Sequence, residues 1–164
     1  MSDALLSVEE LNAYYGSAHV LQNVSFELGE QALAIVGRNG MGKTTLCAAI
    51  DHKLSEICGS LSHGEHRQVA LAVALGANTK IMMLDEPCSG LSRGERQLLT
   101  DLLIALDRKI TLIVIEHDMD VALRVAERVT MMHDGRVIVE GTPDEIRANE
   151  IVHDLYLGRG HRHE

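Results

Sequence analysis

The stretch GRNGMGKTT, residues 37–45, constrains the fold of this chain more than any other. It satisfies the pattern G-x-x-x-x-G-K-[ST] between the apolar run QALAIVG and the segment KTTLCAAIDHKL, whose apolar residues recur at helical spacing. A buried strand, a glycine-rich turn and a helix in this order are typical of a phosphate-binding loop. Glycines let the backbone N–H groups converge on phosphate oxygens, and the helix N-terminus adds a favourable dipole. The stretch therefore predicts binding of a nucleoside triphosphate.

Each residue type in this loop has an expected role. The Lys43 ammonium would bridge the terminal phosphates, and the Thr44 hydroxyl would ligate Mg²⁺. A glycine-rich turn with a chance lysine is the structural alternative, and the strand-to-helix context disfavours it. The residues expected to hold the nucleotide are Gly37, Asn39, Gly40, Gly42, Lys43, Thr44 and Thr45.

Two acids end the apolar strand KIMMLDE, and a histidine ends the strand ITLIVIEH. Asp85 can hold the metal, directly or through water. Its neighbour Glu86 points to the other side of the strand and is the candidate general base for an attacking water. His117 can contact the γ-phosphate and hold the water and Glu86 in place, since ligands bind beyond the carboxyl ends of parallel strands. Solvated surface residues are the alternative, which a nearby phosphate loop disfavours.

Strand and helix signals alternate along the rest of the chain. The N-terminal 30 residues alternate between apolar and polar positions, which predicts short half-buried strands. Helices are expected at about 65–76 and 94–106, and over MDVALRVAERV. VTMMHDGRVIVEG predicts a hairpin turning at its DG dipeptide, and TPDEIRAN predicts a helix capped by Thr142. The expected fold is α/β, with a mostly parallel sheet flanked by helices, an N-terminal antiparallel β section, and one domain over residues 1–164.

Charge and composition exclude several classes of function. The formal net charge of −9 argues against general affinity for nucleic acid, which needs clustered Lys and Arg. No apolar run approaches the roughly 18 residues that cross a bilayer, and no secretory signal is visible. Three cysteines without C-x-x-C spacing fit a reducing compartment. We expect a cytoplasmic protein that reaches the inner face of the cell membrane only through partner subunits.

With these motifs in order, nearly the whole chain resembles an ATP-binding cassette (ABC) ATPase. GRNGMGKTT resembles the Walker A loop, IMMLDEP the Walker B strand, CSGLS the D-loop, LSHGE the signature and IEHD the H-loop. NAYYG resembles the A-loop, whose aromatic ring stacks on adenine, and its place before Gly16 assigns that role to Tyr15. Strand packing of Tyr14 and Tyr15 is the alternative. Within the family, the segments NAYYGSAHVLQNVSFELGE and EHDMDVALRVAERVTMMHDGRVIVEGTPDEIRAN are similar to ATPase subunits of importers of branched-chain amino acids, urea and short amides.

The resemblance implies a composite active unit with ATP and Mg²⁺ as cofactors. In the family, the signature of one subunit closes over the nucleotide held by the Walker A loop of another. Ser62 and Gly64 would offer a hydroxyl and backbone N–H groups to a γ-phosphate. The implied partners are a second ABC ATPase subunit, in a head-to-tail homo- or heterodimer, and membrane permease subunits. His63 and Glu65 depart from the glycine and glutamine that are frequent in the signature.

The interval between the Walker A helix and the signature is far shorter than the family pattern. Intact cassettes carry several dozen residues there, including a strand that leads to the Q-loop glutamine and a helical subdomain that grips the membrane subunits. Here the interval is TLCAAIDHKLSEICGSL, which contains no Gln. We expect it to hold little beyond the end of one helix and a turn, with the helical subdomain and coupling surface absent. A missing core strand would leave unpaired edge groups.

These observations leave two main functions open. The first is the ATPase core of an importer for branched-chain amino acids or related small amides, with hydrolysis slowed by the missing Q-loop. The second is a nucleotide-binding interaction module or minimal core with little hydrolysis and no transport coupling. A third possibility is a defective fragment that neither folds cooperatively nor binds. ATP binding is expected ahead of turnover, and turnover ahead of transport. A natural deletion, an engineered minimal core and a fragment all remain open.

Overall fold

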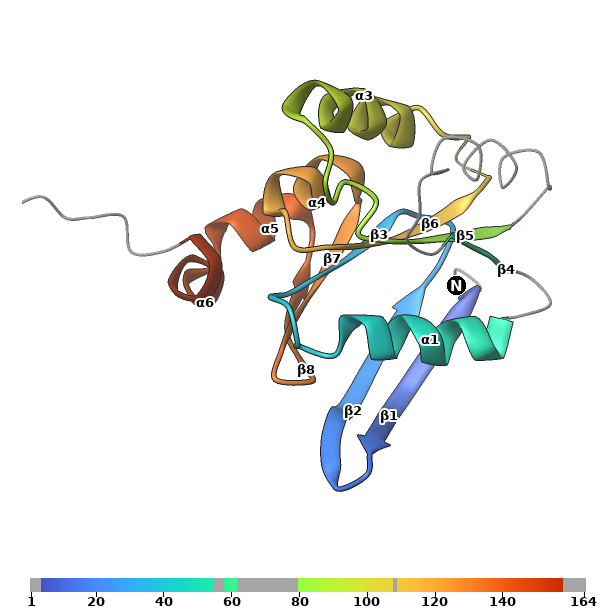
Figure 1. The fold of residues 1–164 in the computed structure, drawn as a ribbon, viewed down its shortest axis with the longest axis vertical. Coiled ribbons are helices and arrows are strands. Elements are labelled where there is room, and N and C mark those ends of the chain that lie inside the picture. Colours follow the sequence, from blue (N-terminus) through green and yellow to red (C-terminus); the bar gives the residue numbers. More distant parts are fainter. Residues whose placement is uncertain (1–3, 55–57, 62–79, 108, 158–164) are drawn as a thin grey trace, which may run out of the picture.

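The computed structural model describes residues 4–54, 58–61, 80–107 and 109–157. Two sheets organise this part of the chain (Figure 1). A two-stranded sheet pairs β1 (Leu6–Tyr15) with β2 (Ala18–Leu28) in antiparallel fashion. The second sheet has six strands in the order β4-β5-β6-β3-β7-β8, and all of its pairs are parallel except β7 with β8. The expected α/β fold with an N-terminal antiparallel section is confirmed.

The elements of the larger sheet and its helices follow in order along the chain. They are β3 (Leu33–Val36), α1 (Lys43–Leu54), β4 (Cys58–Leu61), β5 (Ile81–Asp85), α3 (Arg93–Ile104), β6 (Thr111–Glu116), α4 (Met119–Val125), β7 (Arg128–His133), β8 (Arg136–Gly141), α5 (Pro143–Ala148), α6 (Glu150–Val152) and the π-helical turn η1 (His153–Leu157). Among the described residues, no helix is long and apolar enough to cross a membrane.

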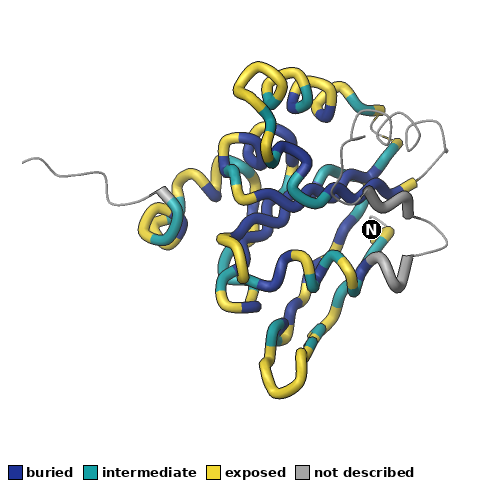
Figure 2. Tube along the Cα trace, viewed as in Figure 1, coloured by how far each residue is buried: buried dark blue, intermediate teal, exposed yellow. Residues whose placement is uncertain are grey.

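The central strands are buried on both faces, which explains their continuous apolar sequences. Alternate residues of β3 enter different clusters: Leu33 and Ile35 pack with α1 and the β1–β2 sheet, whereas Ala34 and Val36 pack with α4, α5 and α6. β5 and β6 divide in the same way between α1 on one face and α3 with α4 on the other. Figure 2 shows this buried centre, with exposed residues along the outer side of α3 and at the tip of the β1–β2 hairpin.

Strand order brings three carboxyl ends together. β6 pairs in parallel with β3 on one side and with β5 on the other, so the residues that follow these strands lie at one edge of the sheet. The phosphate loop follows β3, the acid pair ends β5, and His117 follows β6. Sequence motifs far apart along the chain therefore meet at this edge.

The interval before the signature contains a strand, which corrects one expectation. Cys58–Leu61 forms β4 and pairs in parallel with β5, from Cys58 opposite Ile81 to Leu61 opposite Leu84. The edge of β5 is therefore covered. CGSL gave no strand signal because Gly and Ser have low β propensity and four residues show no usable alternation. The pairing depends on the neighbouring strand. The helix expected at about 65–76 lies outside the described residues.

Local signals located most other elements well. Asp134 and Gly135 both have positive φ, 47° and 72°, as a tight two-residue hairpin turn requires. Thr142 caps α5, and the side chains of Thr142 and Glu145 form a reciprocal capping box. The helix expected over MDVALRVAERV ends early, at Val125, because the chain turns extended at Ala126 and enters β7.

The β7–β8 turn joins the smaller sheet to the larger one. The Gln22 N–H donates to the Gly135 carbonyl at 2.8 Å, and the Arg136 guanidinium donates to the Gln22 side chain. A Cβ atom on Gly135 would lie 2.0 Å from the Val20 carbonyl oxygen. Glycine is therefore required here both by φ and by the close approach of β2.

Replacing Gly135 by Ala is expected to lower the free energy of unfolding by about 2–4 kcal/mol, through the strained φ and the clash with Val20. Gly94 is the matched control, since it lies in α3 with open space around its Cβ position. Gly94→Ala should be neutral or stabilising by about 0.5 kcal/mol. Urea denaturation measures both variants, and equal losses in the two would contradict the required contact at Gly135.

Candidate nucleotide-binding site

The phosphate loop turns sharply between β3 and α1 and is pressed against β7. Gly40 and Gly42 have φ values of 83° and 91°, which only glycine adopts readily. A Cβ on Gly37 would lie 2.7 Å from the Met132 carbonyl oxygen, and a Cβ on Gly42 would lie 2.9 Å from Leu21. The glycines thus provide both the turn and the close packing of the loop between β7 and β2.

Lys43 lies under this loop and is only 5% exposed. Its ammonium donates to the carbonyls of Gly37 at 2.8 Å and Arg38 at 3.0 Å. Burial lowers the pKa of Lys43 below its ordinary value, and three carboxylates oppose this shift. These carboxylates belong, in decreasing order of effect, to Glu86, Asp85 and Glu116. The lysine of the loop and the acids of two neighbouring strands therefore form one electrostatic cluster.

Glu86 and His117 lie together at the exits of β5 and β6. The distance between Glu86 Oε1 and His117 Nδ1 is 3.5 Å, with the side chains 21% and 47% exposed. The Glu86 N–H donates to the Ile115 carbonyl at 2.8 Å, and Glu86 has a positive φ of 46°. A non-glycine residue held in this region is strained, which is common at functional sites. Both side chains are accessible to a ligand bound at this edge.

Glu116 is a member of the cluster that sequence reasoning missed. It ends β6, has no exposed surface, and one of its carboxylate oxygens accepts from the Cys88 N–H at 3.0 Å. Its other oxygen has no hydrogen-bond partner among the described residues. Burial raises the pKa of Glu116 above its ordinary value. Burial also raises the pKa of the Cys88 thiol, to about 11, so the thiol stays protonated at neutral pH. The sequence signal for Glu116 is an acid at the end of the apolar run TLIVIE, directly before the candidate residue His117.

The hydroxyl and carboxylate expected at the metal belong to different elements of this edge. Thr44 is exposed in the first turn of α1, and Asp85 is half-buried at the end of β5. Among the described residues, no group of three or more His, Cys, Asp or Glu side chains is placed to hold a metal alone. Mg²⁺ bound with a nucleotide takes only one or two protein ligands beside phosphate oxygens and waters. The hard oxygen donors of Thr44 and Asp85 fit that mode.

The two tyrosines of the A-loop stretch differ in their surroundings. The Tyr14 ring stacks on His19, with centroids 4.2 Å apart and planes 8° from parallel. Tyr15 is 67% exposed, and its ring stacks on no other ring in the described part of the chain. Both lie near the tip of the β1–β2 hairpin, whose Val20 and Leu21 approach Gly42 of the phosphate loop. Tyr14 is similarly exposed, at 61%, so the two tyrosines differ in that only the Tyr14 ring is already stacked on another ring in the described part of the chain.

The remaining loop residues divide by exposure. Asn39, Gly40 and Thr44 are exposed, whereas Thr45 is half-buried. Ser62 and Gly64, which were expected to contact a γ-phosphate, lie outside the described residues. The structure thus brings together the phosphate loop, the acid pair and the histidine within one chain.

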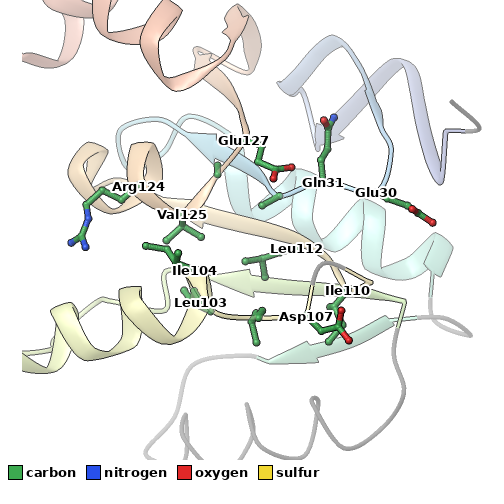
Figure 3. Close-up of a pocket in the computed structure, with 13 residues that line it drawn as sticks. Glu30, Gln31, Leu103, Ile104, Asp107, Ile110, Leu112, Arg124, Val125 and Glu127 are labelled. Carbon is green, nitrogen blue, oxygen red and sulfur yellow. The ribbon is translucent and has the colours of Figure 1, made fainter. Parts of the chain in front are cut away.

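A separate cavity of about 170 Å³ lies near the amino ends of β3 and β6, away from this site (Figure 3). Apolar side chains of α3, α4 and β6 form much of its wall, and Glu30, Asp107 and Glu127 stand at its rim. Arg124 is at this rim too, but its guanidinium bonds to Gln97 and Asp101. An acidic rim disfavours phosphate, so this cavity is a weaker candidate for a nucleotide site than the edge at the carboxyl ends of the strands.

Family models and known proteins are similar to parts of this chain. Residues 21–61 match the ABC transporter family, and residues 136–162 match the family described as branched-chain amino acid ATP-binding cassette transporter. The chain is 33% identical over 102 residues to the high-affinity branched-chain amino acid transport ATP-binding protein BraF of Pseudomonas aeruginosa. It is 35% identical over 101 residues to the corresponding protein LivG of Salmonella typhimurium. These sequence matches support an ABC transporter ATPase domain.

The sequence matches cover only part of this chain and less than half of each relative. The match to BraF takes in 61% of this chain and 40% of BraF, and the match to LivG takes in 60% and 40%. The matched segments thus span less than half the length of these curated relatives. The solved structure of cbiO1 from Clostridium perfringens, part of the ABC transporter complex cbiONQ, superposes with a TM-score of 0.79. That superposition covers 94% of this chain and 95% of the other at 24% identity, and it supports the ABC ATPase fold.

Replacing Glu116 by Ala is expected to lower the free energy of unfolding of the ABC domain by about 3 kcal/mol, since it leaves the Cys88 N–H unpaired and opens a cavity. Glu116→Gln keeps the acceptor oxygen and the volume, and should cost less than about 1 kcal/mol at pH 5. Urea denaturation measures both variants. Equal losses would show that the hydrogen bond to Cys88 is unimportant.

The same variants separate on a pH series. Because burial raises the pKa of Glu116, its protonation favours the folded state at low pH, and that contribution is lost as pH rises from the unfolded value through the folded one. Glu116→Gln removes this loss. The stability of the Gln variant relative to the original protein should therefore rise with pH, and a flat difference would contradict the buried position of the acid.

Proposed function

We propose that residues 1–164 form one ATP-binding domain that holds Mg-ATP at the loop 37–45 and hydrolyses it. The main observation behind this proposal is the electrostatic cluster that Lys43 forms with the acids under the loop. Lys43 is buried below the loop, within the fields of Asp85 and Glu86, which end the strand next to β6. A buried cation beside a glycine-rich turn attracts phosphate, and acids at the same edge can hold a metal and activate water.

The residues of the site divide the chemistry between them. Backbone amides from Gly40 to Thr45 surround the phosphate groups, and the Lys43 ammonium exchanges carbonyl contacts for phosphate oxygens. Thr44 and Asp85 would hold Mg²⁺, which would supply charge stabilisation at the terminal phosphates. Glu86 accepts the proton of the attacking water. His117, 3.5 Å from Glu86, keeps that carboxylate in place.

The assembled enzyme is proposed to be a head-to-tail dimer with another ABC ATPase subunit, identical or different. Ser62 and Gly64 of one subunit would then complete the site on the Walker A loop of the other. Membrane permease subunits would bring the domain to the inner face of the cell membrane. The similarity to BraF and LivG supports a branched-chain amino acid, or a related small amide, as the transported solute.

A nucleotide-binding module with little hydrolysis is the second candidate, favoured by the short interval between α1 and the signature. That interval contains no Gln to complete the water and metal contacts of the Q-loop. The loop, Lys43 and the acids do not depend on it, so binding would survive the loss better than turnover. Phosphate release measured beside ATP affinity distinguishes the two functions, since tight binding with no release above the Lys43→Ala background identifies the module.

Replacing Lys43 by Ala should weaken Mg-ATP binding by at least about a hundredfold, because the loop loses its only buried cation for the phosphates. Lys109→Ala, which removes an exposed lysine of equal charge, is the matched control and should bind like the original protein. Isothermal titration calorimetry measures both.

Glu86→Gln should keep ATP affinity within about threefold while phosphate release falls at least about a hundredfold. Unchanged release in that variant would remove Glu86 from the role of base.

Replacing Tyr15 by Ala should weaken ATP binding by about tenfold, the size of one lost base–aromatic stack. Tyr14→Ala is the control, because that ring is already stacked on His19. The affinity for inorganic triphosphate should be the same in both variants, since it has no base. A larger loss of ATP affinity in Tyr14→Ala would exchange the roles of the two rings.

A further inference from the structure

The C-terminal segment reaches the phosphate loop through a single hydroxyl. Tyr156 belongs to η1, and its ring packs against the cluster formed by α4, α5 and α6 with β3 and β7. Its hydroxyl accepts from the Arg38 N–H at 3.0 Å and donates to the Met132 carbonyl at 2.9 Å. One side chain therefore bridges the loop and β7, and its loop partner Arg38 lies 118 positions earlier in the sequence.

The position of this bridge is where direct pairing between β3 and β7 stops. The last paired residues are Val36 and Met131. Beyond them the loop leaves the sheet, and the Arg38 N–H and the Met132 carbonyl no longer face each other as ladder partners. The Tyr156 hydroxyl occupies the gap and satisfies both groups. A hydroxyl that accepts one bond and donates another is polarised by both, which strengthens the pair.

The same two loop residues hold the lysine. The Lys43 ammonium donates to the carbonyls of Gly37 and Arg38, and Tyr156 fixes Arg38 through its N–H. Gly37 has no room to move toward β7, since even a Cβ there would lie 2.7 Å from the Met132 oxygen. Burial raises the pKa of the Tyr156 hydroxyl, so it remains protonated and able to donate at neutral pH.

We propose that Tyr156 is a positioning residue for the phosphate loop: its hydroxyl holds the base of the loop on β7, and so presets the loop for a nucleotide. The effect on affinity rests on the proposed ATP-binding function, whereas the effect on the loop does not. A loop that is already ordered loses less conformational freedom on binding, so the contact favours the bound state without touching the ligand.

The test compares two variants of the full chain. Tyr156→Phe removes the hydroxyl and keeps the ring in its apolar cluster. Val152→Ala, from the same segment, loosens the cluster at a fully buried side chain and leaves the hydroxyl in place. Amide hydrogen exchange by NMR, without nucleotide, reads the loop directly. We expect exchange at Arg38 to speed up about tenfold or more in Tyr156→Phe, with Ile35 unchanged, and to follow only the overall loss of stability in Val152→Ala.

Titration of each variant with Mg-ATP gives the second readout. Affinity should fall about fivefold in Tyr156→Phe, the size of one hydrogen bond, and less in Val152→Ala once its thermal stability is taken into account. Exchange at Arg38 within about twofold of the original protein would overturn the proposal, as would an equal acceleration in Val152→Ala. If the original protein bound no nucleotide, the proposed function would fail, while the exchange data would still decide whether Tyr156 holds the loop.

Discussion

A buried ammonium group is costly unless hydrogen bonds and opposite charges surround it, and Lys43 meets this requirement in one specific way. Two carbonyls of its own loop lie at 2.8 and 3.0 Å, and three carboxylates supply negative charge. Those carboxylates can approach only because β6 lies between β3 and β5, with all three strands running in the same direction. The burial of the Lys43 ammonium therefore depends on this strand order and on the apolar packing that maintains it.

Sequence reasoning succeeded where the signal was local. The apolar strands, the loop between β3 and α1, the tight turn before β8 and the cap at Thr142 all follow from patterns within about ten residues. It failed where a feature depends on distant segments. β4 is a strand because β5 lies beside it. Glu116 is buried at the end of β6, where it pairs with Val36 of β3 and accepts a hydrogen bond from Cys88. The bridge made by Tyr156 joins residues 118 positions apart, with no trace in either local pattern.

The short interval before the signature bears differently on binding and on coupling. β4 pairs with β5 along its full length, so the parallel sheet keeps an edge strand beside the acids. Among the described residues, the groups that surround Lys43 come from the loop itself, from the end of β5 and from β6, and none of these groups lies in the shortened interval. What the interval lacks is a glutamine and the length for a helical subdomain. The groups proposed to hold phosphate therefore do not depend on the residues that this interval lacks.

The loop is held from several directions, and each contact excludes a different movement. Lys43 draws the carbonyls of Gly37 and Arg38 inward, Met132 blocks Gly37 on the side of β7, and Leu21 lies close to Gly42 on the side of β2. Catalytic and binding groups that are fixed before the ligand arrives require no reorganisation when it does. The hydroxyl of Tyr156 adds the one contact in this set that originates in the C-terminal segment. Docking of that segment and order of the phosphate loop are for this reason linked through a single atom, so a change that displaces η1 alters the site without touching any residue that meets the nucleotide.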